Sequence, residues 1–173
     1  MRLLIFLLMF LCGSLSWSKE GRDPEVIKNI DLNRYMGKWY EIAHKPNFFQ
    51  NLCEWSTAEY QLLESGKVSV LNRCYKGEKQ ITSISGTAAA KDSLAPAKLQ
   101  VDFGFFRKGD YWIVDLDENY QWAVVSGPNM KSLFILSRTA QMDNSTLEMI
   151  LENLKTRGFN ISDLIYDKQP SAL

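Results

Sequence analysis

The chain has 173 residues, a length that fits one domain and can bury a hydrophobic core without many disulfides. Lysine plus arginine and aspartate plus glutamate both number 20, so the formal net charge is zero. This balance argues against the basic surface of a nucleic-acid-binding protein and against an electrostatic patch for anionic membranes. Aromatic residues make up 12% of the chain, and aromatic side chains favour strands.

The N-terminus has the pattern of an export signal. Arg2 precedes an apolar run over residues 3–11, and small residues follow at Ser16 and Ser18. The run is about half as long as a membrane-spanning helix needs to be. We therefore predict a signal peptide over residues 1–18 and an exported protein, either periplasmic in a bacterium or secreted.

Cys12 allows a second interpretation of the same segment. Bacterial lipoproteins carry a lipid on a cysteine that ends the signal, usually after a small residue, whereas Leu11 precedes Cys12 here. An outer-membrane lipoprotein anchored through Cys12 is therefore the alternative to a free exported protein.

Eight short strand-like runs follow a polar N-terminal arm over residues 19–30. Ser65 and Gly66 form a tight-turn pair, which predicts a hairpin between the second and third runs. Residues 98–105 alternate between apolar and polar or small side chains, as in a half-buried strand. Eight consecutive strands with short loops predict an all-β, up-and-down antiparallel barrel, because closure leaves no exposed sheet edge. The predicted strands are residues 38–45, 55–63, 67–75, 80–90, 98–105, 111–116, 121–126 and 133–137.

The hydrophobic period changes after the eighth run. Ser145 and Glu148 predict a capping box at the start of a helix, and Gly158 is placed to end it. One amphipathic helix after eight strands needs an apolar surface to cover, so we predict that it packs on the outside of the barrel. Residues 159–166 are expected to add a short final strand. The helix presents one apolar stripe, formed by Leu147, Ile150, Leu151 and Leu154.

Removal of the signal leaves two cysteines, Cys53 and Cys74. Exported compartments are oxidising, so two cysteines there predict one disulfide. Counted outward from the hairpin turn, Cys74 pairs near Thr57, and Cys53 lies only a few residues beyond that position. Two free thiols are the alternative.

Three motifs in this order resemble those of the lipocalin family. Gly37-Lys38-Trp39 is similar to the Gly-x-Trp that opens the first strand, residues 115–120 to the second motif, and Leu136-Ser137-Arg138 to the third. Residues 120–128 and 133–139 resemble most closely the bacterial outer-membrane lipocalins, whose relatives include apolipoprotein D. The resemblance implies a barrel and helix over residues 31–168, with residues 169–173 as a tail.

The motif residues have structural roles in this resemblance. It implies that Trp39 lies across the closed end of the barrel and that Arg138 stacks on its indole face. Gly37 leaves room for close approach of the backbone. Together with Asp117 and Tyr120, these residues are therefore expected to build the fold and not to contact the ligand.

Groups suited to catalysis or metal binding are sparse. His44 is the one histidine, and neither a second histidine nor a cysteine pair at metal-ligand spacing accompanies it. Asp115 and Asp117 are explained as turn formers. We therefore predict no enzyme activity, no metal and no cofactor.

Binding, storage or transport of a hydrophobic ligand is the function that the resemblance implies. The expected ligand is a fatty acid or a (lyso)phospholipid, and the expected role is maintenance of the envelope membrane. The alternative is an interaction protein, in which residues 103–106 form an aromatic patch for homodimerisation or membrane contact. The candidate ligand-binding residues are Phe48, Phe49, Tyr60, Phe103, Phe105, Tyr111, Trp112 and Trp122.

Overall fold

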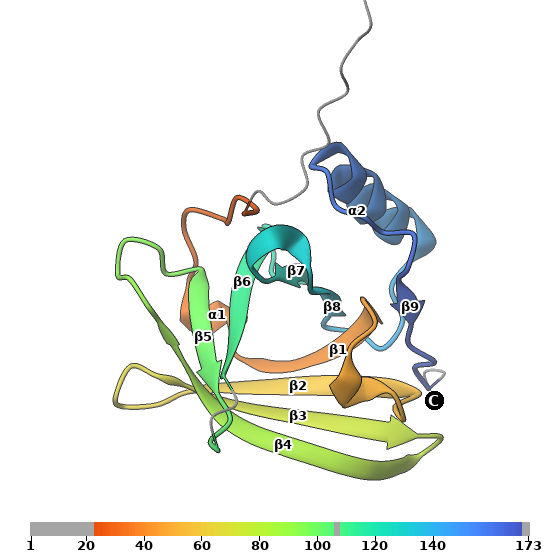
Figure 1. Ribbon diagram of the computed structural model, residues 1–173, viewed down its shortest axis with the longest axis horizontal. Coiled ribbons are helices and arrows are strands. Elements are labelled where there is room, and N and C mark those ends of the chain that lie inside the picture. The colour runs from red at the N-terminus through yellow and green to blue at the C-terminus, as the bar shows by residue number, and fades with distance from the viewer. Residues whose placement is uncertain (1–22, 106–107, 171–173) are drawn as a thin grey trace, which may run out of the picture.

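Eight strands form a closed antiparallel barrel in the computed structural model, which describes residues 23–105 and 108–170 (Figure 1). The predicted signal peptide, Cys12 and Phe106 lie outside these residues. The barrel strands are β1 (Gly37–His44), β2 (Trp55–Leu62), β3 (Val68–Lys76), β4 (Lys79–Ala90), β5 (Lys98–Asp102), β6 (Lys108–Leu116), β7 (Trp122–Ser126) and β8 (Leu133–Ser137). The other elements are α1 (Leu32–Tyr35), the short 3-10 helices η1 (Phe48–Gln50) and η2 (Pro128–Met130), α2 (Asn144–Thr156) and β9 (Ile165–Tyr166).

The order of the strands confirms the up-and-down barrel. Strands β2 to β8 follow one another in chain order, and β1 lies beside β8. β1 also pairs with β2, from Gly37 opposite Tyr60 to Tyr40 opposite Thr57, and this pairing closes the ring. Closure removes the exposed strand edges that would otherwise invite pairing with another chain.

The side chains of the barrel form two hydrophobic clusters on its two faces. Successive residues of a strand point to opposite faces, so Ile113 joins the inner cluster and Val114 joins the outer one. The inner cluster contains Trp39, and the outer cluster contains Ile150 and Leu154 of α2. The helix therefore covers the outer wall, as predicted, and lies outside the ring in Figure 1.

Asp143 caps α2, so the predicted capping box that starts at Ser145 is wrong. The Asp143 carboxylate accepts hydrogen bonds from the Thr146 amide at 2.9 Å and from the Ser145 hydroxyl at 2.5 Å. Ser145 therefore lies inside the first turn. The prediction for Gly158 is confirmed, because this residue follows the helix with a φ of 87°. Within the described residues, no helix is both long and apolar enough to cross a membrane.

The fifth strand ends earlier than its alternating pattern predicts. β5 stops at Asp102, because Gly104 and Phe105 take positive φ values of 73° and 45° and turn the chain. The side chain of Phe105 is 92% exposed as a result. Alternation alone cannot distinguish the end of a strand from an apolar residue at the tip of a loop.

The final strand is shorter than the predicted segment, and it lies at the seam of the barrel. β1 and β2 pair only as far as Tyr40 and Thr57. Farther along β1, β9 pairs with Ala43 and His44. The Lys168 amide then donates to the Glu54 carbonyl at 2.8 Å. The C-terminal segment therefore spans the gap where β1 and β2 separate.

Candidate ligand-binding cavity

One end of the barrel is closed around Trp39. The indole is fully buried, and its Nε1 donates to the Tyr35 carbonyl at 2.9 Å. The Arg138 guanidinium lies 3.7 Å from the centre of the Trp39 ring. It also donates to the carbonyls of Arg34 at 2.7 Å, Lys38 at 3.0 Å and Tyr120 at 3.2 Å. Arg138 thus ties three chain segments together beside the indole.

Gly37 makes room for this arginine. A Cβ at position 37 would lie 3.4 Å from Nη1 of Arg138, and the φ of 93° is one that side-chain-bearing residues rarely adopt. Asp117 supports the neighbouring turn by accepting from the amides of Asn119 and Gln121. The Tyr120 hydroxyl accepts from the Asp31 amide at 2.9 Å. Each motif residue therefore contacts backbone at this end of the barrel.

A cavity of about 590 Å³ occupies the rest of the barrel interior. This volume is typical of small-molecule sites, which span about 300–1,000 Å³. Most of the exposed lining is apolar. The apolar lining residues are Phe49, Ala58, Val70, Ile84, Val101, Phe103, Phe134 and Leu136, and the polar ones include Glu41, Gln50, Ser56, Asn72, Thr82 and Asp110.

Four of the eight candidate ligand-binding residues line this cavity: Phe49, Tyr60, Phe103 and Tyr111. The other four do not. Phe48 and Phe105 are 84% and 92% exposed on loops. Trp112 and Trp122 pack in or against the outer cluster. Trp112 follows Tyr111 directly on β6, so strand alternation sends the two rings to opposite faces.

Tyrosine hydroxyls form a small polar cluster deep in the barrel, which the sequence reasoning missed. The hydroxyls of Tyr35 and Tyr111 are 2.7 Å apart, and the ring of Tyr60 lies edge-on to that of Tyr111. Burial raises the pKa of all three tyrosines, so the hydroxyls stay neutral at physiological pH. Tyr35 lies on α1, where no strand pattern marks it as an inward residue.

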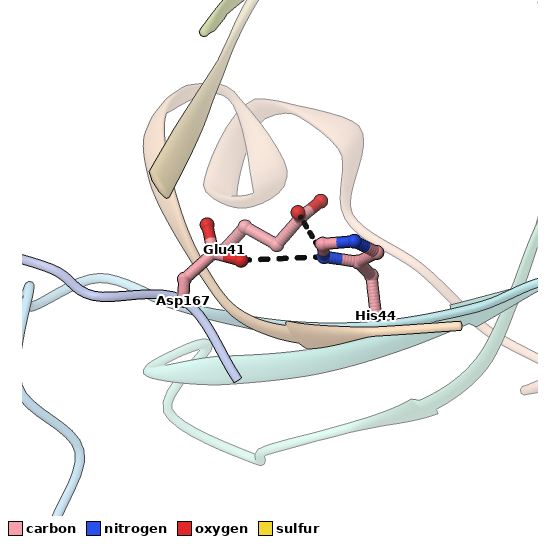
Figure 2. A group of neighbouring side chains, drawn as sticks. All are labelled: Glu41, His44 and Asp167. Carbon is pink, nitrogen blue, oxygen red and sulfur yellow. Dashed lines mark hydrogen bonds and ion pairs between the residues drawn. The ribbon is translucent and has the colours of Figure 1, made fainter. Parts of the chain in front are cut away.

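A buried ionic cluster lies in the wall of the cavity. Nδ1 of His44 is 2.8 Å from Oε1 of Glu41 and 3.2 Å from Oδ1 of Asp167 (Figure 2). Glu41 and His44 come from β1, whereas Asp167 follows β9. Figure 2 shows both carboxylates directed at the same imidazole nitrogen. One protonated histidine thus pairs with two carboxylates.

The pKa values of the cluster follow from burial and from this pairing. Burial alone would lower the pKa of His44, but the hydrogen bonds to Asp167 and Glu41, together with their charges, raise it to about 9. Burial raises the pKa of Glu41 and of Asp167, while the contact with His44 opposes that rise. His44 is therefore a cation at neutral pH.

The same cluster joins the C-terminal segment to the barrel. Oδ2 of Asp167 accepts from the Ser56 amide at 2.7 Å, and the Asp167 amide donates to the Ile42 carbonyl at 3.0 Å. Nε2 of Gln169 donates to the carbonyl of Glu41 at 2.6 Å. Glu41 could have been found from the sequence, because it is a charged residue with the same inward parity as Trp39.

Glu41, His44 and Asp167 form a possible metal-ligand set, since their donor atoms lie within 4.8 Å of one another. An ion-pair cluster explains the arrangement more simply. Both carboxylates contact the same Nδ1, and a nitrogen that donates a hydrogen bond cannot at the same time ligate a metal. Among the described residues, no hydroxyl or thiol hydrogen-bonds to His44, so the cluster contains no nucleophile paired with a base.

Cys53 and Cys74 form a disulfide at the edge of the cavity. Their Cα atoms are 5.3 Å apart. The bond connects the segment before β2 to β3 across a sequence separation of 21 residues. It therefore fixes the chain that carries η1 against the barrel.

Comparisons with known proteins agree with this geometry. A family model described as a lipocalin-like domain matches residues 30–169. The outer membrane lipoprotein Blc of Vibrio cholerae is 39% identical over 84% of this chain and 88% of that protein. Apolipoprotein D of Macaca fascicularis is 31% identical over 98% of this chain and 96% of that protein.

The fold has solved counterparts. Lobster apocrustacyanin A1 superimposes with a TM-score of 0.70 over 88% of this chain and 91% of that chain, at 17% sequence identity.

Proposed function

The chain belongs to the lipocalin family, and we propose that its barrel binds, stores or transports a fatty acid or a (lyso)phospholipid. The observation that carries this proposal is the mostly apolar cavity of about 590 Å³. Burial of an acyl chain contributes about 0.8 kcal/mol per methylene. A long chain thus gains roughly 10 kcal/mol. Association costs of about 4 kcal/mol leave roughly 6 kcal/mol, which corresponds to a dissociation constant in the tens of micromolar.

We further propose that the protein is exported and acts as a lipid carrier in maintenance of the envelope membrane. The predicted signal over residues 1–18 and the similarity to an outer membrane lipoprotein support this role. The mass of the mature N-terminus distinguishes the two forms of export. Cleavage after Ser18 supports a free protein, and an acylated Cys12 supports an anchored one.

Asn72→Trp tests whether the ligand occupies the cavity. Asn72 lines the cavity, and an indole there would fill part of its volume. Leu71→Trp is the matched control, because strand alternation places residue 71 on the outer face of β3. We expect Asn72→Trp to weaken palmitate and lysophosphatidylcholine binding at least about tenfold, with Leu71→Trp close to wild type. Intrinsic tryptophan quenching and native mass spectrometry provide the measurements.

Failure of the wild-type protein to bind either lipid, together with lipid-free protein from native purification, would contradict the proposal. Equal weakening by both tryptophan variants would show that the effect does not come from the cavity.

Exposed aromatic residues favour membrane contact as a second candidate function. Phe48, Phe49 and Leu52 are 84%, 71% and 79% exposed in the segment between β1 and β2, and Phe105 is 92% exposed on the loop after β5. Phe103 does not join them, because it lines the cavity. Sedimentation with phosphatidylcholine vesicles should fall for Phe48→Asp combined with Phe105→Asp. A stable dimer that these changes dissociate would instead favour self-association.

A further inference from the structure

The Glu41 side chain points into the cavity. Glu41 pairs with Leu136 across the β1–β8 ladder, and residues directly opposite in a ladder share a face of the sheet. Leu136 belongs to the inner cluster, and both residues line the cavity. Glu41 is only 6% exposed, so its carboxylate lies within the interior of the barrel.

One oxygen of this carboxylate is engaged and the other is open. Nδ1 of His44 and Nε2 of Gln50 both contact Oε1. Among the described residues, no side chain or amide donates to Oε2. Oε2 is not one of the fully buried polar atoms that lack a hydrogen-bond partner, so it is still accessible to solvent. Glu41 lines the cavity, and Oε2 is the oxygen of its carboxylate that no donor of the described residues engages.

Carboxyl groups outnumber cations around Oε2. Glu41 and Asp167 both contact one protonated histidine, His44, so the cluster offers no spare positive charge to a ligand carboxylate. Arg73 and Lys108, the cationic lining residues within the described part of the chain, have carboxylate partners elsewhere. Arg73 contacts Glu59 at 2.7 Å, and Nζ of Lys108 lies 3.8 Å from Asp102. Negative charge at Glu41 repels a ligand carboxylate and attracts a donor.

We propose that Oε2 of Glu41, held in place by His44 and Gln50, accepts a hydrogen bond from the head group of the ligand. The cavity then selects single-chain lipids whose head group carries hydroxyl or ammonium donors over free fatty acids. This inference rests on the proposed function and narrows its ligand class.

A series of matched C16 lipids tests the selection. Palmitate, hexadecylamine and monopalmitoylglycerol share one chain length and differ in the head group. At pH 7.5 we expect the amine and the monoacylglycerol to bind about tenfold more tightly than palmitate. A hydrogen bond to a charged group changes the dissociation constant by about that factor. Tryptophan quenching below the aggregation concentration of each lipid measures the three dissociation constants.

Glu41→Gln should remove most of this preference, because the variant keeps the size of the side chain and loses its charge. Glu64→Gln is the control, since Glu64 is an exposed carboxylate in the turn between β2 and β3, does not line the cavity, and should leave the preference unchanged. If Glu41→Gln does not fold, Glu41→Asp retains the charge and withdraws the oxygens. It should weaken both donor lipids and leave palmitate unchanged.

The outcomes separate this inference from the function on which it rests. If no C16 lipid binds the wild-type protein, the proposed function fails. If all three bind equally, or palmitate binds most tightly, the lipid-binding function stands and the role of Glu41 is overturned. A preference that persists in Glu41→Gln overturns it as well.

Discussion

At the scale of single residues, the half-buried Arg138 and the buried His44 are two cations that hold parts of the barrel together by different means. Arg138 stacks on Trp39 and donates to three carbonyls, whereas His44 pairs with two carboxylates. A guanidinium stays protonated throughout the accessible pH range, but an imidazole does not. The His44 cluster should therefore respond to pH, and the Arg138 contacts should not.

The free energy of unfolding should fall between pH 7 and about 9.5 because of His44. The pKa of His44 is raised from 6.5 to about 9 in the folded protein, so its stabilising contribution is complete below the unfolded value and is lost as pH rises through the folded one. The shift corresponds to on the order of 3 kcal/mol. Urea unfolding of wild type and His44→Gln across this range measures the difference. Parallel curves would contradict the prediction.

Arg138→Lys should destabilise the protein by about 2–3 kcal/mol, because an ammonium group cannot reach three carbonyls and stack on the indole together. Arg34→Lys is the control. Arg34 lies 4.1 Å from the centre of the Tyr120 ring, but it is exposed, so its loss should cost less. Chemical unfolding measures stability, and lipid binding should be unchanged because Arg138 does not line the cavity. Equal losses in the two variants would show that the three carbonyl contacts and the stacking on Trp39 are not the cause.

At the scale of elements, α2 stabilises the barrel from outside and takes no part in the cavity. Ile150 and Leu154 are almost completely buried against the outer cluster, while the cavity lies on the other face of the same strands. The helix and the ligand therefore use opposite faces of one sheet. Changes beneath the helix should affect stability without affecting affinity.

Leu154→Ala should lower the free energy of unfolding by about 2–5 kcal/mol, because it leaves a void at a fully buried position. Leu151→Ala is the matched control. Leu151 lies about one helical turn before Leu154 and is only partly buried, so its truncation should lower the free energy of unfolding by less. Thermal and urea unfolding provide the stabilities, and tryptophan quenching by palmitate provides the affinity. A loss of affinity in folded Leu154→Ala would contradict the separation of the two faces.

At the scale of the whole molecule, periodicity predicted most of the fold and only part of the cavity. The eight strands and the outer helix follow from the spacing of hydrophobic residues, which changes from every second residue in the strands to a helical spacing in α2. A single sequence shows this change directly. Whether Tyr111 or Trp112 faces the cavity depends on the register of β6, and a shift of one residue inverts that assignment. Four of the candidate residues therefore lie away from the cavity.

The cluster of Glu41, His44 and Asp167 could not be predicted from the sequence for a different reason. His44 and Asp167 are 123 positions apart, and nothing near either residue indicates the other. Their contact exists only because β9 lies beside β1 after β2 has separated from it. Long-range polar contacts of this kind need the closed topology before they can be assigned.

The C-terminal segment across the seam has a consequence for the timing of folding. A ribosome must synthesise residue 167 before His44 can meet its second carboxylate and before the gap between β1 and β2 is spanned. Because contacts distant in sequence form slowly, the nascent chain should stay open through almost all of its synthesis. An open chain is also the form that can be threaded across a membrane before it folds.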